Sequence, residues 1–206
     1  MLKFYYSSFT CSTASHIALE ESGLPYEAIE VSWKRNLNVE KLNQLNSLGA
    51  VPVLVTQKNE VITQNTAILE YIADQVPAKK LLASVGTAER SQTLSWVSFV
   101  ASDLQKSYLP LFRAEAMTSS VGAQKEIEKF AEQSVRELLN HVDSALAKGG
   151  FIVGEHFTIA DALLFVISGW AEWAEIDLAE YENLARYRKQ IAERPAVEKI
   201  LKLEDS

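Results

Sequence analysis

Cys11 is the only cysteine of the chain, and it stands where an apolar segment gives way to a helical pattern. A thiol at a helix N-terminus lies at the positive end of the helix dipole, which favours the thiolate. Ser12 supplies a hydroxyl group next to it, and Tyr5 or Tyr6 can place another nearby. The alternative is that Cys11 is a small buried hydrophobe and Ser12 a helix cap. Without a second cysteine, redox chemistry at Cys11 requires an external thiol.

A second group of residues lies in the segment 49–68, where two apolar runs flank a polar turn and predict a β-hairpin. Pro52 opens the hairpin and cannot donate to a strand ladder. A cis peptide bond before it would present the backbone of Val51 to an extended peptide. Gln64 and Asn65 open the next helix, whose free N–H groups suit a carboxylate. These features predict a site for a peptide-like ligand; the alternative is an ordinary hairpin packed on a helix.

The elements that position these residues follow the order β-α-β-α-β-β-α. They are a strand over 2–6, a helix from 11 to about 23, a strand over 25–31, a weakly helical segment over 33–48, the hairpin and a helix over 65–75. The first two strands therefore form a parallel pair with a right-handed crossover. The order resembles a thioredoxin-like domain. Cys11 and Pro52 then share the edge of the sheet at which open α/β folds bind ligands.

The remainder of the chain predicts helices only. The expected segments are 88–112 with a break near Pro110, 123–148, 158–173, 183–193 and 195–202. The segment 158–173 is hydrophobic nearly all round, so we expect it at the centre of a second domain. Thr158 and Asp161 have capping-box spacing at its start. The predicted architecture is an α/β domain over 1–76, a linker over 77–86 and an all-helical domain over 87–206.

Composition excludes several classes of protein. The 206 residues are 48% hydrophobic and 23% charged, which is ordinary for a globular protein. A formal net charge of −7, spread over both halves, predicts neither a nucleic-acid partner nor a membrane surface. A single cysteine and the lack of a signal-peptide core favour a cytoplasmic location. His16, His141 and His156 lack metal-ligand spacing with Cys11, so we expect no metal site.

Several short motifs, taken in order, resemble cytosolic glutathione transferases, and most of all the bacterial beta class. They are Phe4-Tyr5, Cys11–His16, Glu21–Gly23, Asn46–Leu54, Ala67–Asp74, Pro110–Arg113, Phe157–Ala162 and Ala192–Pro195. The resemblance covers nearly the whole chain. It implies an enzyme that conjugates the thiolate of glutathione, its co-substrate, to small hydrophobic electrophiles. It also implies a homodimer without a further cofactor.

The resemblance assigns roles at the sulfur of glutathione. Cys11 sits at the position that contacts this sulfur or forms a mixed disulfide with it, and Tyr5 matches a tyrosine nearby. Ser12 is a second candidate donor to the bound thiolate. Val51 is expected to pair through its backbone with the cysteinyl part of glutathione, before a cis-Pro52.

The two ends of glutathione correspond to other positions. Lys34 or Arg35 lies where a basic side chain meets the glycine carboxylate. Gln64 and Asn65 lie where the family holds the γ-glutamyl end. Many relatives carry an acidic residue at the first of these two positions, which can pair with the α-ammonium group. Because a charge-assisted contact is roughly twice as strong as a neutral one, Gln64 predicts weaker binding of glutathione.

The electrophile side also departs from the family pattern. Some beta-class members carry a histidine directly before the lysine that matches Lys106, and Gln105 stands there instead. Gln105, Tyr108 and Phe112 are candidates for the electrophile pocket. Packing in the core or at a dimer interface is the alternative for these aromatic residues.

Two other functions stay open at this point. In the first, Cys11 is redox-active, and the protein reduces mixed disulfides or peroxides with glutathione. In the second, the protein is a non-catalytic module that binds a ligand or a partner on the same scaffold.

Overall fold

The apolar residues of the first strand predict a central strand, and β1 (Leu2–Tyr6) lies within a four-stranded sheet of order β2-β1-β3-β4. The computed structural model describes residues 1–205. β2 (Tyr26–Glu30) runs parallel to β1. β3 (Val53–Val55) runs antiparallel both to β1 and to β4 (Val61–Thr63). The structure therefore confirms the predicted parallel pair and the predicted hairpin.

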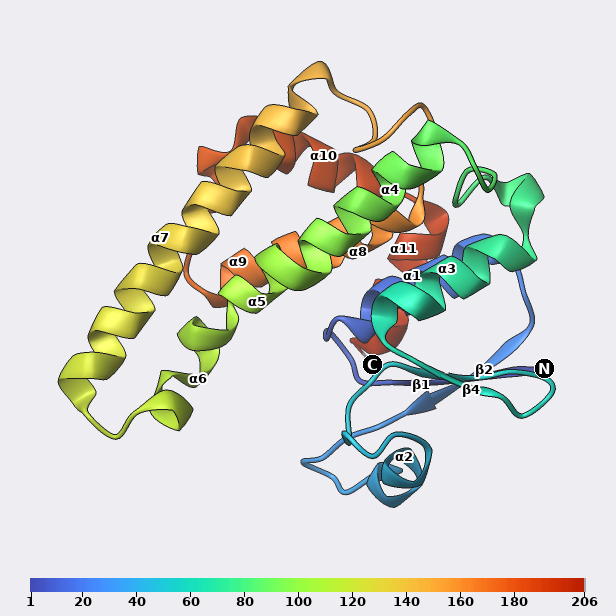
Figure 1. Cartoon of the computed structure of the whole chain (residues 1–206), viewed down its shortest axis with the longest axis horizontal. Coiled ribbons are helices and arrows are strands. Elements are labelled where there is room, and N and C mark those ends of the chain that lie inside the picture. The colour runs from blue at the N-terminus through green and yellow to red at the C-terminus, as the bar shows by residue number, and fades with distance from the viewer. Residues whose placement is uncertain (206) are drawn as a thin grey trace.

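One face of the sheet packs on α1 (Ser12–Ser22) and α3 (Asn65–Gln75), which lie side by side above it (Figure 1). Side chains of a strand alternate between the two faces of a sheet. Leu2, Phe4 and Tyr6 therefore share one face, and they belong to the large core that includes both helices. α1 also contacts the second half of the chain, so it lies between the sheet and the helices that follow.

The other face of the sheet packs on α2 (Val39–Leu45), which lies below the sheet in Figure 1. Tyr5 points to this face because it alternates with its neighbours in β1. It packs in a smaller cluster with Val31, Leu42 and Val53. The predicted weakly helical segment thus contains a short helix that covers this cluster.

A short 3-10 turn over Pro77–Lys79 follows α3, and the next helix begins after a cap at Thr87. No strand follows β4 in the part of the chain that the structure describes. These bounds agree with the linker predicted over 77–86. The division of the chain into two domains at this linker stays a prediction, and residue 206 lies outside the described residues.

Helices make up the rest of the chain. They are α4 (Ala88–Phe99), a π-helical turn (Val100–Leu104), α5 (Gln105–Ser107), α6 (Leu109–Met117), α7 (Val121–Ala145), α8 (Ile159–Ser168), α9 (Trp170–Trp173), α10 (Glu182–Ala192) and α11 (Pro195–Glu204). In Figure 1, α7 and the run from α4 to α6 form two long arms beside the buried α8. The N-terminal thioredoxin-like domain and the helical remainder match the predicted fold class.

The predicted helix over 88–112 is broken at Tyr108, which separates α5 from α6. Pro110 is the second residue of α6, where a missing N–H group has no intrahelical partner to lose. The break at Tyr108 therefore agrees with the predicted break near Pro110. The segment α6 continues to Met117, beyond the predicted end, with a kink at Arg113.

All ten residues of α8 are buried, which confirms the prediction of a central helix. Thr158 and Asp161 form the predicted capping box at its start. The predicted extension to Trp173 is wrong, because α8 ends at Ser168. Gly169 separates it from the short α9.

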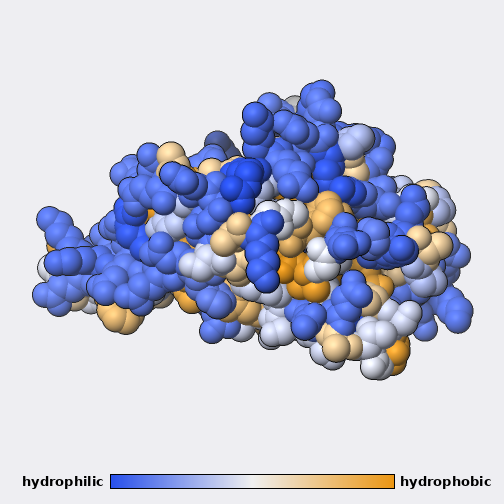
Figure 2. All heavy atoms as spheres, turned by 90° about the horizontal axis from the view of Figure 1, so that it is seen from above, coloured by the Kyte–Doolittle hydropathy of each residue, from blue (hydrophilic) through white to orange (hydrophobic). Residues whose placement is uncertain are grey.

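The surface seen from above is mostly hydrophilic, and hydrophobic residues gather near the centre of that face (Figure 2). α7 is the longest helix at 25 residues, and it is amphipathic, with Ala131, Val135, Leu139 and Val142 buried. Among the described helices, none has both the length and the apolar character that crossing a bilayer requires.

Asp161 is completely buried, and its carboxylate accepts hydrogen bonds from the Ile152 and Thr158 N–H groups and from the Thr158 and Tyr187 hydroxyls. Asp161→Ala leaves these buried donors without an acceptor. We expect the free energy of unfolding to fall by about 3 kcal/mol or more. Urea denaturation followed by circular dichroism measures this change.

Asp177→Ala is the matched control, because exposed Asp177 caps a single N–H group, that of Ala179. We expect Asp177→Ala to lower the free energy of unfolding by about 1 kcal/mol or less. Equal losses for the two variants would contradict the structural role of Asp161.

Candidate functional site

Cys11 is the N-cap residue of α1, so its thiol lies at the tip of this helix, beyond the carboxyl end of β1. Its Sγ atom lies 3.9 Å from the carbonyl oxygen of Val51. The Val51–Pro52 peptide bond is cis, as predicted. The β3 ladder begins at Val53, which leaves the backbone of Val51 outside the ladder. The helix tip and the proline turn therefore meet at one edge of the sheet.

Asn65 joins the first turns of two helices at this edge. Its Nδ2 atom donates a hydrogen bond of 2.6 Å to the Cys11 carbonyl oxygen, and its Oδ1 atom accepts one from the Ser15 hydroxyl. The side chain is buried. Asn65 therefore positions Cys11 relative to α3. A direct contact with a ligand was expected instead, but both ends of the Asn65 amide already have partners in the protein.

Gln64 precedes α3 in a strained conformation, with φ at 71° and ψ at 121°. A positive φ is costly for a residue with a side chain, and such strain gathers at functional sites. Gln64 is exposed, and no side chain caps the first turn of α3. The N–H groups of this turn therefore remain available to an anionic ligand.

The electrostatic surroundings of Cys11 differ from the expectation. Burial raises the pKa of the Cys11 thiol, and a hydrogen bond with the Gln105 side chain and the charge of Lys106 lower it only in part. At Cys11, desolvation of the charged form thus opposes the thiolate that the N-terminus of α1 favours. Gln105 lies next to Cys11 in space, although 94 positions separate the two in the sequence.

Tyr5 does not lie where the sequence predicts it. It belongs to the cluster that α2 covers, whereas Cys11 packs against the core on the opposite face of the sheet. Burial and the charge of Glu27 raise the pKa of Tyr5. The hydroxyl group therefore stays protonated at neutral pH, and among the described residues no hydrogen bond joins it to Cys11.

Ser12 is completely buried and is used within the β1–α1 loop. Its hydroxyl donates to the Ser7 carbonyl oxygen at 3.0 Å, accepts from the Ser7 N–H group, and lies 2.7 Å from the Thr10 hydroxyl. The expected role as a donor to a bound thiolate is not supported, because these contacts occupy the hydroxyl group. Ser12 instead holds the turn that carries Cys11.

Lys34 and Arg35 are exposed in the turn that follows β2. The Arg35 guanidinium forms an ion pair with Glu30, which reduces its availability to a carboxylate. The structure therefore makes Lys34 the better candidate of the two for an anionic end of a ligand.

Tyr108 and Phe112 stack on each other with ring centroids 5.9 Å apart, and both contact Trp170 of α9. Tyr108 is completely buried, so it belongs to the core rather than to a pocket wall. Phe112 is partly exposed. Of the three candidates for the electrophile side, Gln105 is the one that reaches Cys11.

An aromatic pocket of about 340 Å³ adjoins the Cys11 loop. Phe9 and Thr13, which flank Cys11 in the sequence, line it on one side. Phe165, Trp170, Trp173 and Arg188 line it on the other, with Val166, Gly169, Glu172 and Leu201 completing the wall. This pocket offers flat apolar surfaces next to the segment that carries Cys11.

Glu204 of α11 holds the loop that lies between the sheet edge at Cys11 and the aromatic pocket. Its carboxylate accepts hydrogen bonds from the Phe9 N–H group at 2.9 Å and the Thr13 hydroxyl at 2.7 Å. It also lies 2.8 Å from Nδ1 of His16, and both of these side chains are inaccessible to solvent. Phe9 has φ at 57°, so this anchor holds an aromatic residue in a strained conformation at the pocket.

Comparison with known proteins shows that residues 3–74 match the family model "Glutathione S-transferase, N-terminal domain" and residues 103–203 match "Glutathione S-transferase, C-terminal domain". The chain belongs to the glutathione S-transferase family. The predicted family, fold and enzyme class are thereby confirmed.

Full-length relatives of this transferase agree. It is 34% identical to glutathione S-transferase GstA of Escherichia coli O157:H7 over 98% of both chains. Its structure is similar to a sphingomonad glutathione S-transferase complexed with glutathione, with 37% identity, a TM-score of 0.88 and 98% of both chains covered. It is also similar to a bacterial beta-class glutathione S-transferase of Sphingomonas chungbukensis, with 36% identity, a TM-score of 0.87 and 98% of both chains covered. These relatives confirm the predicted similarity to the beta class.

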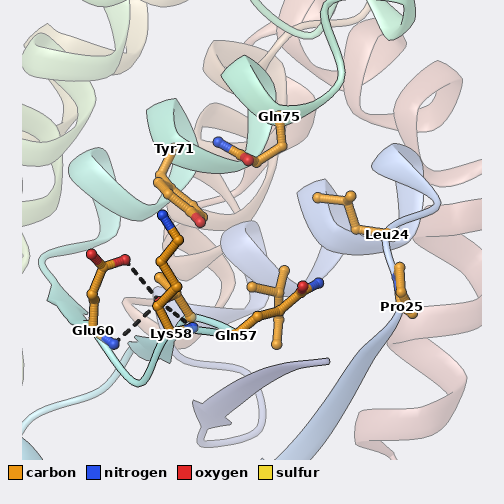
Figure 3. Close-up of a pocket in the computed structure, with 9 residues that line it drawn as sticks. Leu24, Pro25, Gln57, Lys58, Glu60, Tyr71 and Gln75 are labelled. Atoms are coloured by element: carbon orange, nitrogen blue, oxygen red, sulfur yellow. Dashed lines mark hydrogen bonds between the residues drawn. The ribbon is translucent and has the colours of Figure 1, made fainter.

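A separate cavity of about 400 Å³ lies at the other end of the strands of the transferase (Figure 3). Its lining includes Leu2 at the start of β1 and Pro25 just before β2, with Lys58 from the β3–β4 turn and Tyr71 from α3. The predicted site residues lie elsewhere, around Cys11 at the end of β1. This cavity is therefore not the candidate active site.

Sequence reasoning missed three residues at the site of the transferase: Phe9, Arg188 and Glu204. An aromatic residue inside the polar turn 7–10 was a usable signal for Phe9. The sequence contains no such signal for Arg188 or Glu204, because a charged residue in an amphipathic helix is usually solvated.

The raised pKa of Cys11 predicts slow alkylation of the transferase at neutral pH. A raised pKa means that the thiolate forms only at higher pH, so iodoacetamide should react with a midpoint above that of an unburied cysteine. Lys106→Met removes a charge that lowers the pKa, and we expect it to move the midpoint further upward. The pH profile of the alkylation rate measures both effects.

Lys125→Met, at an exposed position of α7, is the control and should leave the profile unchanged. A midpoint below that of free cysteine in the unmodified transferase would contradict the effect of burial.

Proposed function

We propose that this transferase binds glutathione along the edge where Cys11, Val51 and the first turn of α3 converge. The observation that carries the proposal is this convergence, because one edge offers backbone outside the strand ladder, a thiol and a helix N-terminus. The backbone of Val51 pairs with the cysteinyl part of the tripeptide. The N–H groups of the α3 turn bind the γ-glutamyl carboxylate.

The sulfur of glutathione then lies near the N-terminus of α1, beside Cys11 and Gln105. Oriented N–H groups and a neutral hydrogen-bond donor stabilise a thiolate without a buried counter-charge. Lys106 adds a positive charge on the same side. Lowering the thiol pKa by one unit corresponds to ~1.4 kcal/mol, which populates the nucleophile near neutral pH.

The thiolate attacks a small hydrophobic electrophile held in the aromatic pocket beside Phe9. A carbon–sulfur bond forms at the electrophilic carbon, and either a leaving group departs with the bonding electron pair or, at an activated double bond, the neighbouring carbon takes up a proton from solvent. The thiol proton passes to solvent. The aromatic rings of the pocket contribute apolar surface and stacking for such a substrate.

A titration with glutathione tests the proposal and distinguishes it from a non-catalytic module. Calorimetry should detect one site per chain, and turnover of aryl halides should depend on glutathione. A protein that binds no glutathione at millimolar concentration would contradict the proposal.

The resemblance to the family also implies a homodimer in the cytoplasm, and we propose both for this transferase. The relevant measurements are the mass in solution by light scattering and cell fractionation with an antibody against the chain.

Cys11→Ala separates conjugation from the redox alternative. We expect conjugation to retain kcat/KM within about tenfold, because Gln105 and the α1 N-terminus remain and Cys11 is not itself the nucleophile. Any reduction of mixed disulfides that passes through Cys11 should be lost, because no second cysteine can replace it.

The two activities are measured on the same preparations, with an aryl halide and with a glutathione mixed disulfide. Loss of conjugation in a folded Cys11→Ala variant would show that Cys11 does more than contact the bound thiol. Trapping of a Cys11–glutathione disulfide during turnover would support the redox alternative.

Gln64→Glu should strengthen glutathione binding. An acidic side chain at this exposed position adds a charge-assisted contact to the α-ammonium group, which lowers the dissociation constant about fivefold, or by ~1 kcal/mol. Calorimetry measures the change. Gln57→Glu, which adds the same charge at the exposed β3–β4 turn, is the matched control and should have no effect. Equal affinities of Gln64→Glu and the unmodified chain would place the γ-glutamyl end elsewhere.

A further inference from the structure

The aromatic pocket contains a cation, Arg188, whose Cζ atom lies 4.8 Å from the centre of the Phe165 ring and which makes no ion pair among the described residues. Arg188 of α10 lines the pocket together with Phe165, Trp170 and Trp173. Within residues 1–205, its guanidinium forms no ion pair with a carboxylate. Glu172 also lines the pocket and acts on Arg188 through its charge without forming an ion pair. A poorly solvated cation without a paired anion is costly, so its position calls for an explanation.

The guanidinium is held in one orientation. Its Nη1 atom donates to the Phe165 carbonyl oxygen and, at 2.8 Å, to the Ser168 hydroxyl at the end of α8. Gly169 leaves room for it, because a Cβ atom at this position would lie only 2.8 Å from Nη2. The Nη1 side of the guanidinium is thus fixed to the end of α8. Nη2 makes no hydrogen bond within the described part of the chain.

Two further hydrogen-bond donors near Arg188 lack acceptors. The Tyr108 hydroxyl is buried without a partner among the described residues, and the charge of Arg188 acts on it. The indole Nε1 of Trp170, which lines the pocket, is likewise buried without a partner. Only Trp170 of these two belongs to the pocket wall, and its unused donor beside the free edge of the Arg188 guanidinium matches an acidic group.

We propose that Arg188 is a specificity-determining residue that binds the acidic group of a planar aromatic electrophile, such as a carboxylate or a sulfonate. The inference rests on the proposed transferase function and names its substrate class. The ring of the substrate stacks among Phe9, Trp170 and Trp173, and its acidic group reaches Nη2 of Arg188. The alternative is that Arg188 only caps the carbonyl end of α8, which would give it no preference among substrates.

A pair of aryl chlorides that differ by one carboxylate tests the proposal: 4-chloro-3,5-dinitrobenzoate and 1-chloro-2,6-dinitrobenzene. In both reactions the glutathione thiolate forms a carbon–sulfur bond at the chlorinated carbon, chloride leaves with the bonding electron pair, and the thiol proton passes to solvent. Both rings carry the same two nitro groups beside this carbon. The ratio of the two kcat/KM values, normalised to the uncatalysed rates, therefore reports on recognition of the carboxylate.

We expect the unmodified transferase to favour the carboxylated substrate in this normalised ratio. Arg188→Met should raise KM for the carboxylate about tenfold and change KM for the neutral chloride less than about twofold. Glu172→Gln should act in the opposite direction and lower KM for the carboxylate, because it removes a repulsive charge from the same pocket. Arg186→Met, on the exposed side of the same helix, is the matched control and should change neither value.

If Arg188→Met does not fold, Gly169→Ala provides the same test with the charge retained, because the added methyl group displaces the guanidinium. Parallel loss of activity on both chlorides in a folded variant, or equal normalised preference in the unmodified transferase, would overturn the proposal. Failure of the transferase function itself has a different outcome: neither chloride would then react faster with the protein than with glutathione alone.

Discussion

The buried carboxylate of Glu204 is the contact on which the geometry of the site depends. It lies on the last helix of the chain and holds the loop after β1 through the Phe9 N–H group, the Thr13 hydroxyl and His16. Cys11 lies between the first two of these residues. The thiol edge and the aromatic pocket are therefore positioned by the same acceptor. Because a buried charge without its donors is strongly unfavourable, the loop cannot move away from α11 at low cost.

The elements of the first half could be predicted because their signals are local. The apolar and aromatic run 2–6, the glycine that ends α1 and the proline before β3 each act within a few residues, and their order limits the topology. The order of the helical segments in the second half was predicted, as was a break near Pro110, but the separation of α9 from α8 was not. The end of α8 depends on Arg188, which lies 20 residues after Ser168 in the sequence and donates to its hydroxyl. Periodicity along a single helix contains no information about such a contact.

The roles of individual hydroxyl groups were the least predictable part of the site. Tyr5 and Ser12 both lie close to Cys11 in the sequence, yet one faces α2 and the other is used inside the loop. Residue type and spacing show which groups are near the end of a strand. They do not show which face a side chain takes or whether another group already occupies its hydroxyl. The charge state of Cys11 was unpredictable for a related reason, since burial is a property of the packed molecule.

The thiol edge is formed mainly by backbone groups, whereas the aromatic pocket is formed by side chains. This difference explains why the thiol edge was easier to predict. The proposed glutathione site consists of backbone: the Val51 carbonyl, the tip of α1 and the open first turn of α3. Backbone groups are present in every sequence that adopts the fold, so motifs that specify the turn also specify the site. The aromatic pocket consists of side chains from the loop after β1 and from α1, α8, α9, α10 and α11, which meet only after packing. One substitution there changes the charge of the pocket without changing the fold, and no local motif contains residues such as Arg188 or Glu172.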